Sequence, residues 1–500
     1  RSRRDPKGSV LLWYAEADAE NTTIYANFGD ADPRRENVEV TFRPTCFYPT
    51  REGINYITIR GFRISQAATQ WGAPTAEQIG MVAAHWSKGW IIEDNVISNS
   101  KCVGICIGKD RASGQNRWTI ERELTGFNRE LEAIFQAYDM GWSKENIGSH
   151  IVRNNEIFDC EQAGIVGHLG GVFSIIENNY IHDINAKRQY SGAEVGCIKL
   201  HAAIDVIIRG NFLENGYNGL WLDWQGIGTR VTGNIFYNND HTDLWTEVTH
   251  GPCLVDNNIM LSPNAFLDWG QGVCFAHNIV SGYITFHPVT DRYTPYHYPH
   301  STKVVGVMNF PGGDDRYYNN IFTIAPDSDL QDKDAGTSVY NERPPFYPGI
   351  YRDMNTRNTD NQVLKSFIEQ MAQGNSQSAR FQLAMRVGSN VYFNGVKNYA
   401  FEKSDSVRFG DQVKSMNVEQ LSHMNITKAF ISAFGIDDKN VTTNHERQAE
   451  LLRHVLSSAD KRYLIVDKTK FGRRGLYRIS AKGGFDVIFT AEDSGNSFSS

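Results

Sequence analysis

Three residues that can do acid–base and nucleophilic chemistry recur at one interval in this chain. Lys199 lies in GCIKLHA, Asp223 in GLWLDWQG and Glu247 in DLWTEVTHG, and both intervals are 24 residues (223 − 199 and 247 − 223). A cation and two carboxylates at one period predict a column of side chains on stacked, nearly identical coils. We interpret this column as a candidate active site.

The spacing of the two carboxylates suggests a reaction class. One strand apart, they would lie at about 5 Å, which is typical of a retaining glycosidase with a nucleophile and an acid/base. Lys199 beside Asp223 favours an ionised carboxylate, which suits the nucleophile. We expect Glu247 to lie between Asp223 and Asp268, and two like charges would raise its pKa, which suits a general acid/base.

Further residues are expected around this column. Counting back from the Asn that closes each repeat places His168 and Asp268 on it. His201 faces the same side as Lys199 because side chains alternate along a strand, and Glu194 begins the same coil. We expect Glu194, Lys199, His201 and His168 to bind substrate. Four flanking indoles could stack on sugar rings: Trp221, Trp224, Trp245 and Trp269. A solvated polar ladder without catalysis is the competing interpretation.

The elements that must position these residues are short β-branched runs separated by Asn or Gly. The runs begin near residue 55, and successive steps from Asn179 to Asn278 are 32, 23, 24 and 20 residues. Such a period, with several short strands per repeat, is typical of a solenoid in which Asn side chains stack at the bends. Leucine-rich repeats would need regular Leu spacing and a helical half. The sequence therefore predicts an all-β, right-handed parallel β-helix. The anchoring residues are Asn95, Asn155, Asn179, Asn211, Asn234, Asn258, Asn278 and Asn320.

Departures from the repeat predict excursions and boundaries. The 60-residue step before Asn155 predicts a helical excursion over about 115–146, as a wall beside the coils. The alternating segments of residues 8–42 predict three antiparallel strands, and the coils are expected to fade past Phe322. Within the tail, 363–374 reads as a helix and 389–405 as a strand pair with an Asn-Gly turn. We place domains at 1–35, 36–325 (β-helix), 326–407 (its extension) and 408–500 (an α/β piece).

Net charge and cysteine content indicate which partners and which cellular compartment to expect. The net charge of −7 comes without a block of like charges, which disfavours nucleic-acid and membrane partners. Seven cysteines without a CxxC pair or zinc spacing predict reduced thiols, a cytoplasmic location, no metal and no cofactor. The opening RSRRDPKGSV has neither Met nor a signal-like region, so we expect the native start to lie upstream. Assembly into a homo-oligomer is left open.

Several segments resemble glycoside hydrolase family 120, the β-xylosidases built on a right-handed β-helix with an inserted β-sandwich. The resemblance covers about residues 8–405 and includes HWSKGWIIEDN, CEQAGIVGHLG, IKLHAAIDV, WLDWQGIGTR and LWTEVTHGPCLVDNNI. It implies a retaining exo-enzyme for xylan degradation that releases xylose from the non-reducing ends of β-1,4-xylo-oligosaccharides. It also implies Asp223 as nucleophile, Glu247 as acid/base, and Glu194 and Lys199 as contacts to the terminal xylose. Residues 1–35 look like a remnant of the sandwich.

The tail resembles a different family. Residues from about 413 to 495 are similar to part of the effector-binding domain of DeoR-type sugar regulators, in NITKAFISAFGID and KRYLIVDKTKFGRRGLYRIS. The winged-helix DNA reader of such regulators is missing. We therefore interpret this piece as a fusion scar and not as a working regulator.

Two other functions compete with the glycosidase. One is a pectin-active β-helix, either a polysaccharide lyase or a polygalacturonase. A lyase would need Ca²⁺ ligands and a cationic base, whereas the column has a single cation among its acids. A non-catalytic sugar-binding β-helix is the other, and it would have no reason to carry two carboxylates one strand apart. The sequence favours a retaining glycosidase acting on an oligosaccharide.

Overall fold

The computed structural model describes residues 11–72, 76–113, 126–324, 335–345, 383–402, 407–408, 426–431, 433–444, 446–467 and 470–491. The chain divides into two compact units, Arg1–Arg43 and Pro44–Ser500. Nowhere in the described part is a helix long and apolar enough to cross a membrane.

The first unit contains a β-hairpin. Strands β1 (Trp13–Ala17) and β2 (Thr22–Ala26) pair antiparallel, and the Asp18 carboxylate accepts the backbone N–H groups of Glu20 and Asn21 in the turn. The third predicted strand, residues 36–42, is not a strand. Its apolar side chains are exposed, and an alternating pattern without a partner strand has nothing to bury its apolar face against.

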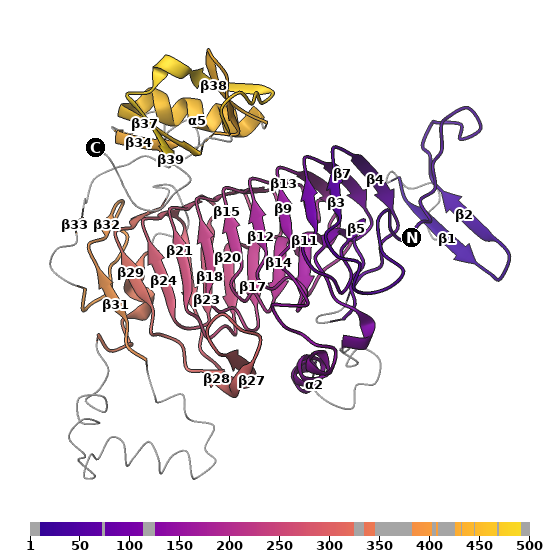
Figure 1. Cartoon of the computed structure of the whole chain (residues 1–500), viewed down its shortest axis with the longest axis horizontal. Coiled ribbons are helices and arrows are strands. Elements are labelled where there is room, and N and C mark those ends of the chain that lie inside the picture. Colours follow the sequence, from indigo (N-terminus) through magenta and orange to yellow (C-terminus); the bar gives the residue numbers. More distant parts are fainter. Residues whose placement is uncertain are drawn as a thin grey trace, which may run out of the picture. The chain divides into compact units, whose positions relative to one another are not determined.

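Most of the second unit is a parallel β-helix, as predicted, in which successive coils add one strand to each of three parallel sheets (Figure 1). Sheet 1 consists of β3 (Thr58–Arg60), β6 (Ile91–Glu93), β9 (Ile151–Arg153), β12 (Ile175–Glu177), β15 (Ile207–Arg209), β18 (Thr229–Thr232), β21 (Cys253–Asp256), β24 (Val273–Ala276), β29 (Arg316–Tyr318) and β31 (Arg386–Gly388).

The other two sheets follow around the same coils. Sheet 2 consists of β4 (Arg63–Ala67), β7 (Val96–Ser100), β10 (Glu156–Cys160), β13 (Tyr180–His182), β16 (Phe212–Glu214), β19 (Ile235–Tyr237), β22 (Ile259–Met260), β25 (Ile279–Ser281), β30 (Ile321–Thr323), β32 (Val391–Tyr392) and β33 (Val407–Arg408). Sheet 3, which carries the candidate site, consists of β5 (Val82–Ala83), β8 (Val103–Cys106), β11 (Ala163–His168), β14 (Gly196–His201), β17 (Asn218–Asp223), β20 (Thr242–Glu247), β23 (Asn264–Trp269) and β26 (Tyr283–Phe286).

A ladder of buried asparagines forms the corner between sheets 1 and 2. Each Asn donates through its backbone N–H and its amide to the side-chain oxygen of the next, and this runs from Asn95 to Asn390. The residue before each ladder Asn has a φ of 55–64°, the left-handed region. Asn, Asp and Gly tolerate that region best, which explains the recurring NN, DN and GN pairs.

The interior is filled by stacked apolar side chains. On sheet 2 one position per coil forms a continuous buried row, because parallel register brings equivalent residues together. Burial of this row, together with the apolar side chains of sheets 1 and 3 in the same core cluster, stabilises the coils. The row is Ile64, Ile97, Ile157, Ile181, Leu213, Phe236, Met260, Val280, Phe322 and Tyr392.

Among the described residues, two excursions leave the coils on the same side (Figure 1), and a hydrogen bond joins them. Helix α2 (Gly126–Asp139) is the helical part of the first, and η1 (Arg111–Ser113) precedes it; the predicted span 115–125 lies outside the described residues. The second is an antiparallel hairpin of β27 (Val289–His297) and β28 (Val304–Phe310). The Tyr138 hydroxyl on α2 accepts the Val304 N–H, so the helix supports the hairpin.

Parallel pairing continues past residue 325, where we expected the coils to fade. The 3₁₀ helix η2 (Thr337–Tyr340) precedes β31, and β32 pairs in parallel with β30 and β33. The expected strand pair over 389–405 is therefore wrong. Asn390 and Val391 extend the ladder and sheet 2, and this burial outweighs the hairpin preference of the Asn-Gly turn that follows. The helix predicted over 363–374 lies outside the described residues.

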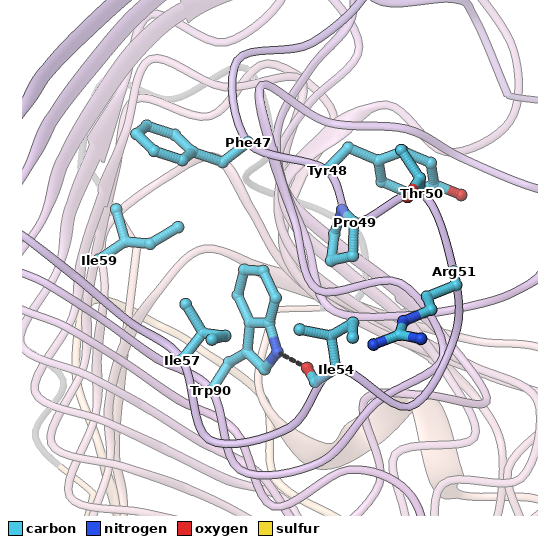
Figure 2. Close-up of a pocket in the computed structure, with 9 residues that line it drawn as sticks. All are labelled: Phe47, Tyr48, Pro49, Thr50, Arg51, Ile54, Ile57, Ile59 and Trp90. Atoms are coloured by element: carbon cyan, nitrogen blue, oxygen red, sulfur yellow. Dashed lines mark hydrogen bonds between the residues drawn. The ribbon is translucent and has the colours of Figure 1, made fainter.

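An apolar pocket of about 300 Å³ lies near the first coil (Figure 2). It is lined by Phe47, Tyr48, Pro49, Thr50, Arg51, Ile54, Ile57, Ile59 and Trp90. The Trp90 indole donates to the Ile54 carbonyl over 2.7 Å. None of the lining residues belongs to the candidate site.

The tail forms an α/β piece with the predicted helix and strands. β34 (Ile426–Ile431), β37 (Ala459–Asp467) and β39 (Val487–Ala491) make a parallel sheet, and β35 (Gly435–Ile436), β36 (Asn440–Thr443) and β38 (Tyr477–Ala481) an antiparallel one. Helix α5 (Glu446–Ser458) contributes to one buried cluster with strands of both sheets, and η7 (Lys482–Gly484) follows β38.

Candidate active site

The two candidate catalytic carboxylates are direct partners on neighbouring strands of sheet 3. Asp223 ends β17, Glu247 ends β20, and the parallel register pairs them. Neighbouring strands lie about 4.8 Å apart, so the two side chains leave the sheet side by side. Both residues are 6 % exposed. The expectation that they lie one strand apart is confirmed.

Of the other residues predicted for the column, His168 is in register as expected, whereas Lys199 and Asp268 are not. The residues in register with Asp223 and Glu247 are His168, His201 and Trp269. Lys199 pairs instead with Trp221, two positions earlier on the same face. Asp268 pairs with Thr246, so it faces the opposite side of the sheet, and its carboxylate accepts the Tyr340 hydroxyl over 2.7 Å. The expected place of Asp268 beside Glu247 is wrong.

Unequal turns explain one of the two positions by which Lys199 is out of register. From Asp223 to Arg230, the sheet 1 residue in register with Ile207 and Leu254, is seven residues, and from Glu247 to Leu254 is also seven. From His201 to Ile207 is six. Counting back from the Asn ladder therefore misplaces any coil whose turn is shorter. The 24-residue interval from Lys199 to Asp223 is therefore not a register interval, because the strand partner of Lys199 is Trp221, 22 residues on (221 − 199).

Lys199 nevertheless reaches Asp223 and neutralises it. Its ammonium donates to Oδ2 of Asp223 over 3.0 Å and also to Oε1 of Glu194. Lys199 is completely buried, and charge pairing must offset the cost of burying three ions. The other oxygen of Asp223, Oδ1, is buried and has no hydrogen-bond partner among the described residues. That oxygen is therefore not engaged by Lys199, which holds Oδ2.

The charges around Glu194 set its ionisation. Burial alone would raise the pKa of this carboxyl, but Lys199 and His201 outweigh burial and lower it well below its usual range. His201 Nε2 lies 3.1 Å from Oε1 of Glu194 and 3.4 Å from Oδ2 of Asp223. Burial and Lys199 would lower the pKa of His201, but the two carboxylates raise it overall. Glu194, Lys199, His201 and Asp223 form one closed ionic network.

Glu247 has the opposite environment. Burial raises its pKa most, Asp223 raises it further, and Arg292 opposes both, which leaves the pKa at about 7. Its Oε2 accepts the indole N–H of Trp221 over 3.1 Å, and its Oε1 accepts Arg292. A carboxyl that titrates near neutrality can both give and take a proton at physiological pH.

His168 links the network to the excursion helix. Its Nε2 lies 3.2 Å from Oε1 of Glu130 on α2, and its ring meets the His201 ring edge-on at 5.2 Å. Burial, followed by the charge of Lys109, holds the pKa of His168 well below its usual range. A neutral His168 that donates Nε2–H to Glu130 keeps Nδ1 as an acceptor, and Nδ1 has no hydrogen-bond partner among the described residues.

The flanking indoles divide into two groups. Trp221 and Trp245 stack on each other at 4.2 Å and 9°, and the Lys199 ammonium lies 4.6 Å from the Trp221 ring. Trp224 instead lies in a buried cluster with Val289 and Phe310 of the hairpin. Its position beside the carboxylates is as expected, but its ring is only 4 % exposed, and its role in substrate binding stays a prediction.

Three site residues were missed by the sequence analysis: Gln78, Glu130 and Arg292. Gln78 donates to Oε2 of Glu194 over 3.0 Å. Glu130 and Arg292 come from the two excursions, which carry no repeat that could align them. The long step between Asn278 and Asn320, 42 residues, was an available signal for the second excursion.

Within the described part of the chain, two groups have atoms close enough to ligate a cation: Glu130, His168 and His201, and Glu194, His201 and Asp223. In the second group the Lys199 ammonium already supplies the positive charge. A Ca²⁺-dependent lyase is therefore poorly matched to this set of donors, because calcium would have to compete with a fixed ammonium.

Comparisons with known proteins agree with both resemblances. Residues 1–40 match the family model of the glycoside hydrolase 120 insertion domain, and residues 407–492 match that of the DeoR C-terminal sensor domain. The structure of XylC in complex with xylose is similar, with 45 % sequence identity and a TM-score of 0.72. The match covers 80 % of this chain and 60 % of XylC.

A second relative matches a shorter part of the chain. The HTH-type transcriptional repressor GlcR of Bacillus subtilis (strain 168) is 26 % identical over 108 residues, which is 22 % of this chain and 39 % of GlcR. The chain thus spans well under half of GlcR and about three fifths of XylC. The resemblance to glycoside hydrolase family 120 and to the DeoR sensor domain is confirmed.

Proposed function

We propose that this chain is a retaining glycoside hydrolase that releases xylose from the non-reducing ends of β-1,4-xylo-oligosaccharides by double displacement. The observation that carries the proposal is the pairing of Asp223 with Glu247 in unlike surroundings. One carboxylate is neutralised by a buried ammonium, and the other has a pKa of about 7. Retaining catalysis requires this difference between two close carboxyl groups.

In the first step the buried Oδ1 of Asp223 attacks the anomeric carbon. A bond forms between Asp223 and the sugar while the bond to the leaving-group oxygen breaks, and Glu247 gives its proton to that oxygen. Lys199 holds the other Asp223 oxygen at 3.0 Å, which fixes the orientation of the attacking carboxylate. The leaving sugar departs neutral.

In the second step Glu247, now ionised, takes a proton from water. The resulting hydroxide attacks the anomeric carbon from the face that the leaving group vacated, and the bond to Asp223 breaks. Xylose leaves with its original configuration, Asp223 is again a carboxylate, and Glu247 is again protonated. No step consumes a cofactor.

The choice of xylose rests on XylC, which binds xylose and shares 45 % identity with this chain. We propose that Glu194, Lys199, His201 and His168 bind the terminal sugar, because all four lie on the face that carries Asp223. A cytoplasmic location stays a prediction of the sequence, which leaves assembly into a homo-oligomer open.

The test is hydrolysis of p-nitrophenyl β-D-xylopyranoside by the wild type, Asp223→Ala and Glu247→Ala, each with and without azide. Asp240→Ala, which removes an exposed carboxylate, is the matched control. We expect both site variants to lose activity and the control to keep it. Azide should yield an α-xylosyl azide with Asp223→Ala and a β-xylosyl azide with Glu247→Ala. Full activity in either site variant would refute the assigned roles.

A further inference from the structure

The β27–β28 hairpin is attached to the two turns that follow the catalytic carboxylates. Gln225, two residues after Asp223, hydrogen-bonds His297 of β27 over 2.8 Å. His250, three residues after Glu247, hydrogen-bonds the carbonyl of Thr294 over 3.1 Å. The hairpin is therefore fixed relative to both carboxylates, although it lies outside the coils.

This hairpin sends one charged side chain to the site. Arg292 donates through Nη1 to Oε1 of Glu247, and its side chain is 15 % exposed. The second oxygen of Glu247 accepts the Trp221 indole N–H. Both partners of Glu247 are donors without an acceptor, so together they fix the plane of the carboxyl and favour its ionised form.

Three charged groups act on Glu247, each from a different strand. Asp223 on β17 disfavours the ionised form, whereas Arg292 on β27 and Lys199 on β14 favour it. Arg292 is the stronger of the two cations because it is hydrogen-bonded to the carboxyl. Lys199 acts at longer range, because its ammonium is held by Asp223 and Glu194.

We propose that Arg292 is a positioning residue, through which the hairpin orients the Glu247 carboxyl and sets the pH at which it exchanges its proton. The proposal rests on the proposed function, since it assigns Arg292 a part in the acid/base step of that reaction. It also places the leaving-group side of the site against the hairpin, because Glu247 must face the departing oxygen.

The proposal predicts a displaced titration. An opposite charge at hydrogen-bonding distance commonly lowers a carboxyl pKa by about one unit or more. Removing the guanidinium in Arg292→Met should therefore raise the pKa of Glu247 from about 7 by about one unit. The alkaline limb of kcat/KM should move upward by the same amount, since Glu247 must be protonated for the first step.

The experiment compares the wild type, Arg292→Met and Lys303→Met. Lys303 is an exposed cation of the same hairpin excursion, so its removal changes the net charge equally without touching Glu247. Glu247 is titrated by infrared difference spectroscopy of its protonated carboxyl, with Glu247→Gln identifying the band. The pH profile of kcat/KM is measured with aryl xylosides of good and poor leaving groups.

We expect both the infrared titration and the alkaline limb to shift in Arg292→Met and to stay in place in Lys303→Met. The loss of kcat should be larger for the poor leaving group, which needs the aligned proton. An unshifted infrared titration in Arg292→Met would overturn the proposal. If no aryl xyloside is hydrolysed by the wild type, the proposed function fails, while the infrared titration still decides what Arg292 does to Glu247.

Discussion

Replacing Lys199 by methionine is expected to destabilise the β-helix by about 3–5 kcal/mol, the usual cost of leaving a buried charge without its partner. Methionine keeps the unbranched stem, so little packing is lost. What disappears is the ammonium that donates to Asp223 and Glu194, and both carboxylates stay buried. His201 is left to compensate two negative charges alone.

The loss of unfolding free energy in Lys199→Met should be larger at neutral pH than at acidic pH. In the wild type the pKa of Glu194 is held below its ordinary value of 4.5, with Lys199 and His201 outweighing burial. Such a carboxyl contributes stability above pH 4.5, and this stability is lost as the pH falls through the folded-state pKa. Lys199→Met shrinks this contribution. The difference from the wild type should be largest near pH 7 and should narrow below about pH 4.5.

Urea unfolding followed by circular dichroism measures the free energy of unfolding of each variant. Lys187→Met is the matched control, because the Lys187 ammonium lies 3.8 Å from the buried Glu161 but its side chain is 51 % exposed. An exposed ammonium of this kind is worth about 1 kcal/mol or less. If Lys199→Met is no less stable than Lys187→Met at pH 7, the ammonium does not neutralise the site and our account of Asp223 is wrong.

Two more predictions concern the asparagine ladder and the positive charge that Lys199 places beside Asp223. Asn234→Ala should cost about 3 kcal/mol or more, because it leaves the Asn211 N–H, the Asn211 amide and the Ile208 carbonyl short of a partner in the interior. The exposed Asn146→Ala should cost under about 1 kcal/mol in the same unfolding assay, and equal losses would contradict the ladder's role. Dialysis against EDTA should leave xyloside hydrolysis unchanged because Lys199 supplies the positive charge, and loss of activity that Ca²⁺ restores would favour the metal-dependent alternative.

The fold could be predicted because one short-range rule repeats. A left-handed residue followed by Asn marks the same corner in each coil, and the β-branched runs on either side are too short for anything but strands. The extent of the coils was harder to predict. After Phe322 the steps between ladder residues lengthen to 70, and only the structure shows that Asn390 takes the next place.

The pairing of the two carboxylates could be predicted because the turns after Asp223 and Glu247 have equal length. Lys199 was found through the same count although its register differs, since a lysine is long enough to reach a carboxylate two positions away on the next strand. Asp268 shows the limit of counting. A shift of one residue turns a side chain from one face of a strand to the other, and spacing alone does not reveal that shift.

Arg292 and Glu130 could not be predicted from periodicity. Both lie on excursions whose position over the coils depends on tertiary contacts, such as the packing of the hairpin against Trp224 and the contact of Tyr138 with Val304. Nothing in the local sequence of DRYTPYHYPH says which side chain turns toward Glu247. Of the two described side chains that hydrogen-bond Glu247, Trp221 lies on a coil and Arg292 lies on the hairpin outside the repeat.

The asparagine ladder allows successive coils to stack in the same way whatever the number of residues between consecutive ladder asparagines. The same amide hydrogen bond joins Asn258 to Asn278 across 20 residues, Asn278 to Asn320 across 42, and Asn320 to Asn390 across 70. Insertions can therefore lengthen, shorten or be exchanged while the next coil docks unchanged. For protein engineering, this means that the β27–β28 hairpin, which contacts Glu247, can be exchanged for another insertion between the same two ladder residues. Such an exchange would change the side chains beside Glu247 and leave the coils that carry the two carboxylates in place.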